Sequence, residues 1–154
     1  MNEPVIFQSQ IKNVNFGRNV KVVTPVNLYD CTIGNDTFIG PFVEIQKGVK
    51  IGDNCKIQSH SFVCELVSIG NNTVVAHGVM FINDLFAQGG PANGKKELWK
   101  KTLIGNNVSI GSNATILPVE ICDNVVIGAG SVVTRSITEP GIYAGNPAKK
   151  LRSI

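Results

Sequence analysis

Two small groups of residues in this chain have side chains that could take part in chemistry. Glu65, Asn83 and Asp84 offer carboxylates and an amide, and His60 and His77 are the only two histidines among 154 residues. Carboxylates and imidazoles can transfer protons near neutral pH, and an amide can orient a reacting group by hydrogen bonding. Whether these residues meet in one site depends on the elements that carry them.

A six-residue repeat of large apolar residues predicts those elements. From Ile33 to Phe81 every sixth residue is aliphatic or aromatic, and the residue two places earlier is nearly always small or β-branched. A period of six is typical of a parallel β-helix, with short strands such as 37–39 and 49–51 and with Gly, Asn and Asp at the corners. Three hexads close one triangular coil. No coil can bury its core alone, so several must stack.

The repeat also predicts how many coils stack. It runs from Phe16 to Phe81 as four coils, stops, and runs from Ile104 to Val133 as two more. One step of five residues occurs in each part, and neither step disturbs the frame that follows. We therefore expect an all-β fold, a β-helix of about six coils.

The same pattern divides the chain into the β-helix itself, one inserted loop and a segment at each terminus. We expect a single hexapeptide-repeat domain over residues 1–154, with an inserted loop over 83–103 after the fourth coil. Residues 135–154 are turn-rich and basic, and should form a C-terminal cap. Residues 1 to about 13 keep the repeat poorly and are expected to cover the open end of the first coil.

Counting the hexads in threes allows the three corners of the prism to be compared. Glycine follows the inward-facing residue in most coils at the first corner and never at the third, from which the loop departs. The third corner stacks Asp30, Lys47, Glu65 and Asn83 in successive coils, so Glu65 and Asn83 should lie about 5 Å apart. We interpret this corner as the active-site edge, although Asp30 and Lys47 are expected only to solvate it.

The loop over 83–103 is a second candidate for function, because long loops inside compact domains are usually functional. It carries Trp99, the only tryptophan. Asn83 and Asp84 begin the loop, where they could either orient a substrate or simply form the turn.

His60 and His77 follow inward-facing residues at the second corner, away from Glu65 and Asn83 of the same chain. Histidines that face solvent at a corner are ordinary. If subunits associate side by side, however, the second corner of one chain could reach the third corner of another. His60 or His77 would then be a site residue contributed across the interface.

The amino-acid composition restricts the classes of protein to which this chain can belong. With 43% hydrophobic and 16% charged residues the chain should fold, and we expect a cytoplasmic protein without a membrane span or a nucleic-acid partner. Four cysteines without C-x-x-C spacing argue against disulfides and a zinc cluster. The net charge of +3 includes two basic clusters that could either attract the phosphates of a small ligand or only be solvated. Their members are Lys95, Lys96, Lys100 and Lys101, and Arg135, Lys149, Lys150 and Arg152.

Three segments of the second half, 104–118, 126–134 and 144–149, together with the ladder and its interruption, resemble the hexapeptide-repeat acyltransferases. That resemblance implies a left-handed β-helix acting as a homotrimer, with three sites at subunit interfaces. Residues 77–86 and 99–102 are similar to the sugar-nucleotide N-acetyltransferases that act on dTDP-linked 3-amino-3,6-dideoxyhexoses.

The resemblance also implies acetyl-CoA as co-substrate, lying over the last coils, and no metal. The backbone amides of Ser112 and Ala129 would hold the pantetheine, because small residues permit close approach. Arg135, Lys149 and Arg152 stand where the family places side chains that meet the adenine and the 3′-phosphate, and cations suit that dianion.

One departure from the family favours an amine as acceptor. Many O-acetyltransferases of the family place a histidine base in the loop, and residues 83–103 contain none. An alcohol needs such a base, whereas a neutral amine is already a nucleophile. The sequence therefore favours N-acetylation over O-acetylation, and the resemblance implies that the acceptor is a nucleotide-linked amino sugar for cell-surface polysaccharide such as lipopolysaccharide. Asn83 and Asp84 would orient the amine, and Glu65 would support them.

Several alternatives stay open at this point. His60, His77 and Trp99 are further candidates for substrate binding. O-acetylation of a sugar or small alcohol remains a second possibility if a histidine crosses the interface, and a non-catalytic β-helix scaffold is a third. A zinc hydratase on the same prism needs three histidine positions, which two histidines do not provide. The nucleotide, the hexose, the amine position and the acyl group are not determined.

Overall fold

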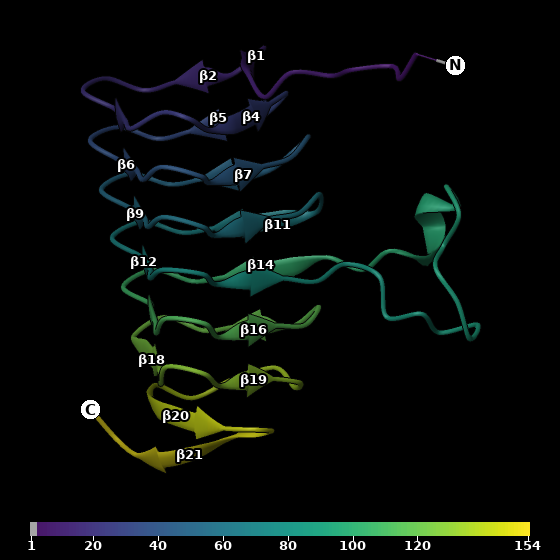
Figure 1. The fold of residues 1–154 in the computed structure, drawn as a ribbon. Coiled ribbons are helices and arrows are strands. Elements are labelled where there is room, and N and C mark those ends of the chain that lie inside the picture. The colour runs from purple at the N-terminus through teal and green to yellow at the C-terminus, as the bar shows by residue number, and fades with distance from the viewer. Residues whose placement is uncertain (1–2) are drawn as a thin grey trace.

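A three-sided β-helix forms the body of the protein in the computed structural model, which describes residues 3–154 (Figure 1). The strands of successive coils pair in parallel and build three sheets, one on each side of the prism. Sheet A contains β1 (Ile11–Lys12), β4 (Asn27–Tyr29), β7 (Glu44–Ile45), β10 (Phe62–Val63), β13 (Met80–Phe81), β16 (Thr115–Ile116) and β19 (Val132–Val133).

The other two sheets complete the prism. Sheet B contains β2 (Asn15–Phe16), β5 (Thr32–Ile33), β8 (Lys50–Ile51), β11 (Val67–Ile69), β14 (Thr102–Ile104) and β17 (Glu120–Ile121). Sheet C contains β3 (Lys21–Val22), β6 (Phe38–Ile39), β9 (Lys56–Ile57), β12 (Val74–Val75), β15 (Ser109–Ile110), β18 (Val125–Ile127), β20 (Gly141–Gly145) and β21 (Ala148–Arg152). The first corner joins sheet B to sheet C, the second joins C to A, and the third joins A to B.

The repeat of apolar residues forms the core, as the sequence predicts. All nine residues of the ladder from Ile33 to Phe81 are at most 4% exposed, and all nine residues two places earlier are at most 2% exposed. Equivalent residues pair between coils, as Ile51 does with Ile33 and Ile69. The expected all-β class and parallel β-helix are therefore confirmed, and the architecture agrees with the left-handed β-helix implied by the resemblance.

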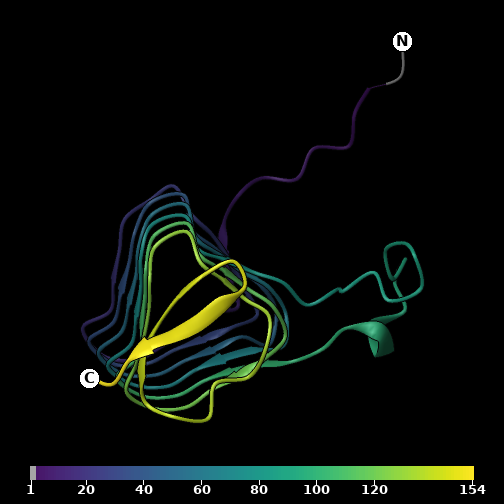
Figure 2. The same ribbon diagram turned by 90° about the horizontal axis from the view of Figure 1, so that it is seen from below.

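Six complete coils, from β2 to β19, stack in this prism, and partial turns extend it at both ends. At the C-terminal end Ile137 bridges to Ile121, and β20 pairs in parallel with β18 before β21 returns antiparallel. This hairpin lies across the end of the prism (Figure 2). It brings the basic residues of β21 next to the last coil.

The other end is built differently from the prediction. Only β1 adds to the prism there, by pairing with β4. The Gln10 carbonyl still accepts a hydrogen bond from the Leu28 N–H at 2.9 Å, but the chain before it leads away from the prism (Figures 1 and 2), and Val5, Ile6 and Phe7 are 82%, 77% and 90% exposed. The expected N-terminal cap is therefore wrong for these residues, because none of their apolar side chains packs on the first coil. Residues 1–2 of that predicted cap lie outside the described residues.

The long loop leaves the third corner between β13 and β14 and projects from the side of the prism (Figures 1 and 2). Its only regular element is the 3₁₀ helix η1 (Lys96–Leu98). The strand pairing of β11 with β14 places Ile69 beside Ile104, so the coil after the loop continues the coil before it. The loop is thus an insertion that leaves the register intact.

Candidate active site

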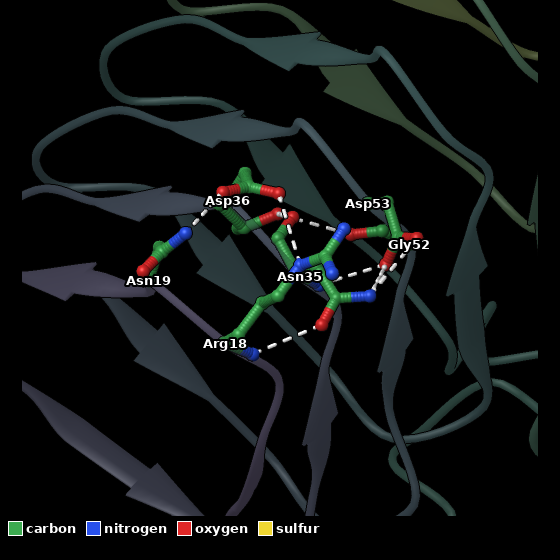
Figure 3. A network of polar contacts seen from close by, with 7 residues as sticks. Arg18, Asn19, Asn35, Asp36, Gly52 and Asp53 are labelled. Atoms are coloured by element: carbon green, nitrogen blue, oxygen red, sulfur yellow. Dashed lines mark hydrogen bonds and ion pairs between the residues drawn. The ribbon is translucent and has the colours of Figure 1, made fainter.

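The first corner satisfies its backbone with its own side chains. An Asn or Asp in each coil accepts a hydrogen bond from the backbone N–H of the equivalent residue one coil earlier, at 2.7 to 2.9 Å. The accepting side chains are Asn35, Asp53, Asn71, Asn106 and Asp123. Figure 3 shows the start of this ladder, with Arg18, Asn35 and Asp53 in succession. Hydrogen bonds from the Asn106 N–H and side-chain amide hold the pKa of Asp123 below its ordinary value.

The second corner has no such ladder. Its equivalent positions hold Pro41, Ser59, His77, Ser112 and Ala129, and the N–H groups of the last four have no acceptor within residues 3–154. Their successors do bond between coils: the Asn113 N–H donates to the His77 carbonyl and the Gly130 N–H to the Ser112 carbonyl, both at 2.8 Å. The second corner therefore offers a row of backbone donors, about 4.8 Å apart, to a bound molecule.

Small residues keep this row accessible. A Cβ on Gly111 would lie 2.5 Å from the Ala129 nitrogen, so only glycine allows the coils to stack this closely. Ala129 itself is exposed and Ser112 is half-buried. The expected pantetheine positions, Ser112 and Ala129, thus lie in adjacent coils on one edge.

Both histidines lie on that same edge. His77 is one coil before Ser112. His60 follows Ser59, the residue one coil before His77, and its ring stacks on Phe42 with the ring centroids 4.8 Å apart. Both side chains are exposed. Sequence reasoning separated the histidines from the third corner, and the structure agrees within one chain. It missed that His77 adjoins Ser112, although counting corners across the loop could have revealed this.

The third corner brings together Glu65, Asn83 and two residues of the loop. The Asn83 side-chain amide donates to the Glu65 carbonyl at 3.2 Å, so these residues are neighbours as predicted. The Lys96 ammonium lies 2.8 and 3.0 Å from the two oxygens of the Glu65 carboxylate, whose side chain is 19% exposed. The same ammonium lies 5.1 Å from the centroid of the Trp99 ring. Lys96 was not among the predicted site residues, and its membership of a basic run was the only signal.

Asp84 has a local role in the loop. Its two carboxylate oxygens accept hydrogen bonds from the N–H groups of Phe86 and Ala92, at 2.9 and 2.7 Å. The Lys100 N–H donates to the Asn83 carbonyl at 2.9 Å and closes the base of the loop. This arrangement matches the turn-forming alternative for Asp84, whereas the Asn83 side chain keeps its oxygen without a donor in the described chain.

The predicted cofactor cations fall in two places. In the hairpin, Lys149 pairs with Ala144, close to the second corner, and Arg152 pairs with Ile142 at the other end of β21. Arg135 follows β19 at the third corner and is exposed. Lys150 is instead paired with Glu139 at 2.9 Å, and this pair lowers the pKa of Glu139 and raises that of Lys150.

The described residues contain no group of three or more His, Cys, Asp or Glu side chains arranged to hold a metal ion. All four cysteines are free. No helix in the part of the chain that the structure describes is long and apolar enough to cross a membrane. In one chain, then, candidate groups gather on two separate corners: open backbone amides with histidines on the second, and the Glu65, Asn83 and Lys96 group on the third.

Two family models match the two halves of the ladder. The model described as "Bacterial transferase hexapeptide (six repeats)" matches residues 30–65, and "Hexapeptide repeat of succinyl-transferase" matches residues 101–135. Among curated proteins, the chain is 38% identical over 108 residues to the bifunctional protein GlmU of Acetivibrio thermocellus, which covers 70% of this chain and 21% of that protein. The chain spans between about a fifth and a third of the length of the curated relatives it matches.

Solved structures share the fold. One is AntD, an N-acyltransferase from Bacillus cereus in complex with dTDP and 3-hydroxybutyryl-CoA, with a TM-score of 0.79, 23% identity, and coverage of 92% of this chain and 82% of that one. Another is a maltose O-acetyltransferase from Clostridium difficile 630, with a TM-score of 0.53, 25% identity, and coverage of 95% and 69%. Hexapeptide-repeat models thus match on both sides of the loop, and the structure has the parallel β-helix that such repeats build.

Proposed function

We propose that this protein transfers an acetyl group from acetyl-CoA to the amino group of a nucleotide-linked amino-deoxy sugar. The observation that carries the proposal is the row of backbone N–H groups at the second corner, which have no acceptor among the described residues and which end beside the basic hairpin. The amide carbonyls of a pantetheine arm are suitable acceptors for such a row. AntD, which shares the fold, is an N-acyltransferase solved with dTDP and an acyl-CoA, and this supports the class of both substrates.

The row suggests how the co-substrate would lie. The N–H groups of Ser112 and Ala129 would hold the pantetheine, and Lys149, one partial coil further on, would meet the 3′-phosphate. Arg152 would extend the same basic strand toward the adenine. The thioester would then point back along the corner toward His77. In this pose the last coils bind the nucleotide end of CoA and the middle of the prism receives the acceptor.

The proposed reaction requires little from side chains. A neutral sugar amine attacks the thioester carbonyl carbon, so that the C–N bond forms and the carbonyl oxygen becomes an oxyanion. A backbone N–H of the open row would stabilise that charge. The C–S bond then breaks, and the departing CoA thiolate accepts the proton released by the amine. No loop histidine is needed for these steps.

The third corner would orient the acceptor. The Asn83 side-chain oxygen could accept a hydrogen bond from the amine, because its nitrogen is already engaged by Glu65. Asp84 would act by shaping the loop, and the Glu65 pair with Lys96 would hold the loop against the prism. Since the second and third corners lie on different edges of one chain, we propose that the site forms between neighbouring subunits of a homotrimer. Arg135 would then reach the CoA bound to the adjacent chain.

A screen of nucleotide-linked amino sugars with acetyl-CoA, followed by thiol release, tests this function. A form of AntD was solved with dTDP-4-amino-4,6-dideoxyglucose and coenzyme A, so the panel should contain 3-amino and 4-amino sugars on both dTDP and UDP. We expect turnover with at least one dTDP-linked sugar. Failure with every amino sugar, while acetyl-CoA still binds, would contradict the proposal.

Lys149→Ala tests the position of the co-substrate. We expect the KM for acetyl-CoA to rise about tenfold, because a charge-assisted contact with phosphate is lost, while the KM for acetyl-dephospho-CoA stays the same. Lys47→Ala, another exposed lysine far from the hairpin, should change neither value. An equal rise in KM for both co-substrates in Lys149→Ala would contradict the contact between Lys149 and the 3′-phosphate.

O-acetylation is the second candidate, and the position of His77 beside Ser112 favours it. An exposed imidazole there could accept the proton of an alcohol as the alcohol attacks. His77→Ala separates the two reactions. An alcohol acceptor should lose nearly all turnover in this variant, whereas an amine acceptor should keep its kcat.

A further inference from the structure

A hollow lies on the outer face of sheet C, over the first three coils and between the first and second corners. Its volume is about 850 Å³. Its floor is a row of three outward-facing residues in adjacent strands, because Phe38 pairs with Lys21 of β3 and with Lys56 of β9. The hollow thus presents one aromatic ring between two ammonium groups.

The two lysines have no acidic partner in the described part of the chain. Asp36, the one acid that lines the hollow, accepts a hydrogen bond from the Asn19 side-chain amide at 2.9 Å and lies 3.9 Å from the Arg18 guanidinium (Figure 3). Both lysines are exposed and Phe38 is half-buried. Two cations without counter-charges, about 10 Å apart along the sheet, therefore flank an accessible aromatic face.

This combination suits one ligand class. A flat aromatic base gains from stacking on a phenylalanine ring, and phosphate oxygens gain from lysine ammonium groups. A volume of 850 Å³ lies within the range of small-molecule sites. We infer that this hollow binds the nucleoside diphosphate part of the acceptor, with the base on the Phe38 ring and the phosphates beside it, within reach of the flexible Lys21 and Lys56 ammonium groups.

The position of the hollow is consistent with the proposed acyl transfer. Gln58, which also lines it, follows β9 and leads into the second corner at Ser59 and His60. From the coil of Lys56 to the coil of Ser112 is two steps, or about 10 Å. A hexose linked to a diphosphate at Lys56 can span that distance. The inference rests on the proposed function only for the identity of the sugar that extends from the nucleotide.

Direct binding measurements test the hollow without requiring catalysis. We would titrate the full-length protein with dTDP by calorimetry, and repeat this with UDP, thymidine and inorganic pyrophosphate. We expect dTDP to bind more tightly than either thymidine or pyrophosphate alone, because only dTDP engages both the ring and the cations. Lys21→Gln and Lys56→Gln should each raise the Kd for dTDP about tenfold, and Phe38→Leu should do so for dTDP but not for pyrophosphate.

Two matched variants serve as controls. Lys50→Gln removes an exposed, outward-facing lysine in the same coil as Lys56 but on sheet B, and Phe62→Leu replaces a half-buried, outward-facing phenylalanine on sheet A. Both should leave the Kd for dTDP unchanged. Size-exclusion chromatography of every variant checks that the oligomeric state is retained.

The outcomes separate this inference from the proposed function. If dTDP binds and the two lysine variants weaken it, the subsite stands even when no amino sugar is acetylated. If an amino sugar is acetylated but Lys21→Gln and Lys56→Gln bind dTDP as tightly as the wild type, the subsite is overturned and the function survives. Absence of dTDP binding to the wild type, or loss of binding only together with dissociation of the oligomer, also overturns the subsite.

Discussion

The first and second corners of the prism belong to the same coils and have similar backbone turns, yet they treat their N–H groups in opposite ways. At the first corner each group meets an Asn or Asp oxygen from the next coil. At the second corner the equivalent groups of Ser59, His77, Ser112 and Ala129 meet no acceptor in the described chain. One edge is therefore specialised for stability and the other is left available to a ligand.

Buried threonine side chains support the hydrogen-bonded ladder of the first corner. The buried Thr37 and Thr73 hydroxyls add a second layer beneath the ladder, each donating to a glycine carbonyl one coil on and accepting from a backbone N–H. The backbone N–H groups of the ladder thus have partners within the chain, from Arg18 to Asn106. A ligand gains little from these groups, because each new bond would replace an existing one.

The largest expected effect comes from blocking the open edge. Ala129→Trp places an indole over the free N–H row, and we expect kcat/KM for acetyl-CoA to fall on the order of 100-fold, about 2.7 kcal/mol of transition-state binding. The thermal midpoint should hardly change, because Ala129 is exposed. Steady-state kinetics and thermal unfolding measure the two effects. Glu120→Trp, an exposed site in the same coil on sheet B, is the control and should retain activity; equal losses in both would mean that the second corner is not special.

Thr73→Val should produce the opposite result. The change keeps the shape of the side chain but leaves the buried Val108 N–H and Gly105 carbonyl without their partner, which costs about 1–3 kcal/mol of unfolding free energy. The Michaelis constants should stay the same. Denaturant unfolding measures the loss, and Thr32→Val, on the exposed outer face of β5, should leave stability unchanged. A stable Thr73→Val variant would argue against the second polar layer.

Asn71→Ala tests the side-chain ladder of the first corner, whose residue Asn71 is exposed whereas Thr73 is buried. It removes the acceptor that the Asp53 N–H uses at 2.8 Å, so we expect a loss of about 1 kcal/mol. Ser59→Ala is the matched change at the second corner, where the side chain caps no backbone group, and it should be neutral in the same unfolding experiment. Equal losses of unfolding free energy in the two alanine variants would contradict the proposed difference between the first and second corners.

The smallest effect concerns Cys122, which takes the place of glycine where the first corner begins in the sixth coil. Burial raises the pKa of all four thiols, to about 11 for Cys31 and about 12 for Cys64. Thiolates therefore stay scarce at pH 8, and the half-buried Cys122 should react with a thiol reagent before the three buried cysteines. The rate should rise with pH. Cys122→Ser should abolish the fast phase; a fast phase that persists would mean that a core thiol is accessible.

The third corner marks the limit of prediction from the repeat. Its contacts between Glu65 and Lys96 join residues 31 positions apart, through a loop that has no period. The first-corner contacts, by contrast, recur at 17 or 18 positions until the loop intervenes, which is one coil. Periodic contacts can be counted along a sequence, whereas a loop contact depends on how one irregular segment folds back.

The sequence by itself determined the β-helix, its core residues, its coil register and the corner from which the loop leaves. It did so because each inward position must hold a side chain that fills the prism, and a six-residue period places that requirement on every coil. It also placed Glu65 beside Asn83 and put both histidines on another corner, since a corner follows directly from the register.

Only the tertiary structure decided what the remaining groups do. In the structure the Asp84 carboxylate accepts hydrogen bonds from two loop N–H groups, and Lys96 pairs with Glu65. Val5, Ile6 and Phe7 are exposed, and the second-corner N–H groups have no acceptor among residues 3–154. Each of these depends on which donor finds which acceptor in space. Residue type and spacing do not specify that choice, because a carboxylate, an amide or an apolar arm can satisfy its requirements with many different partners.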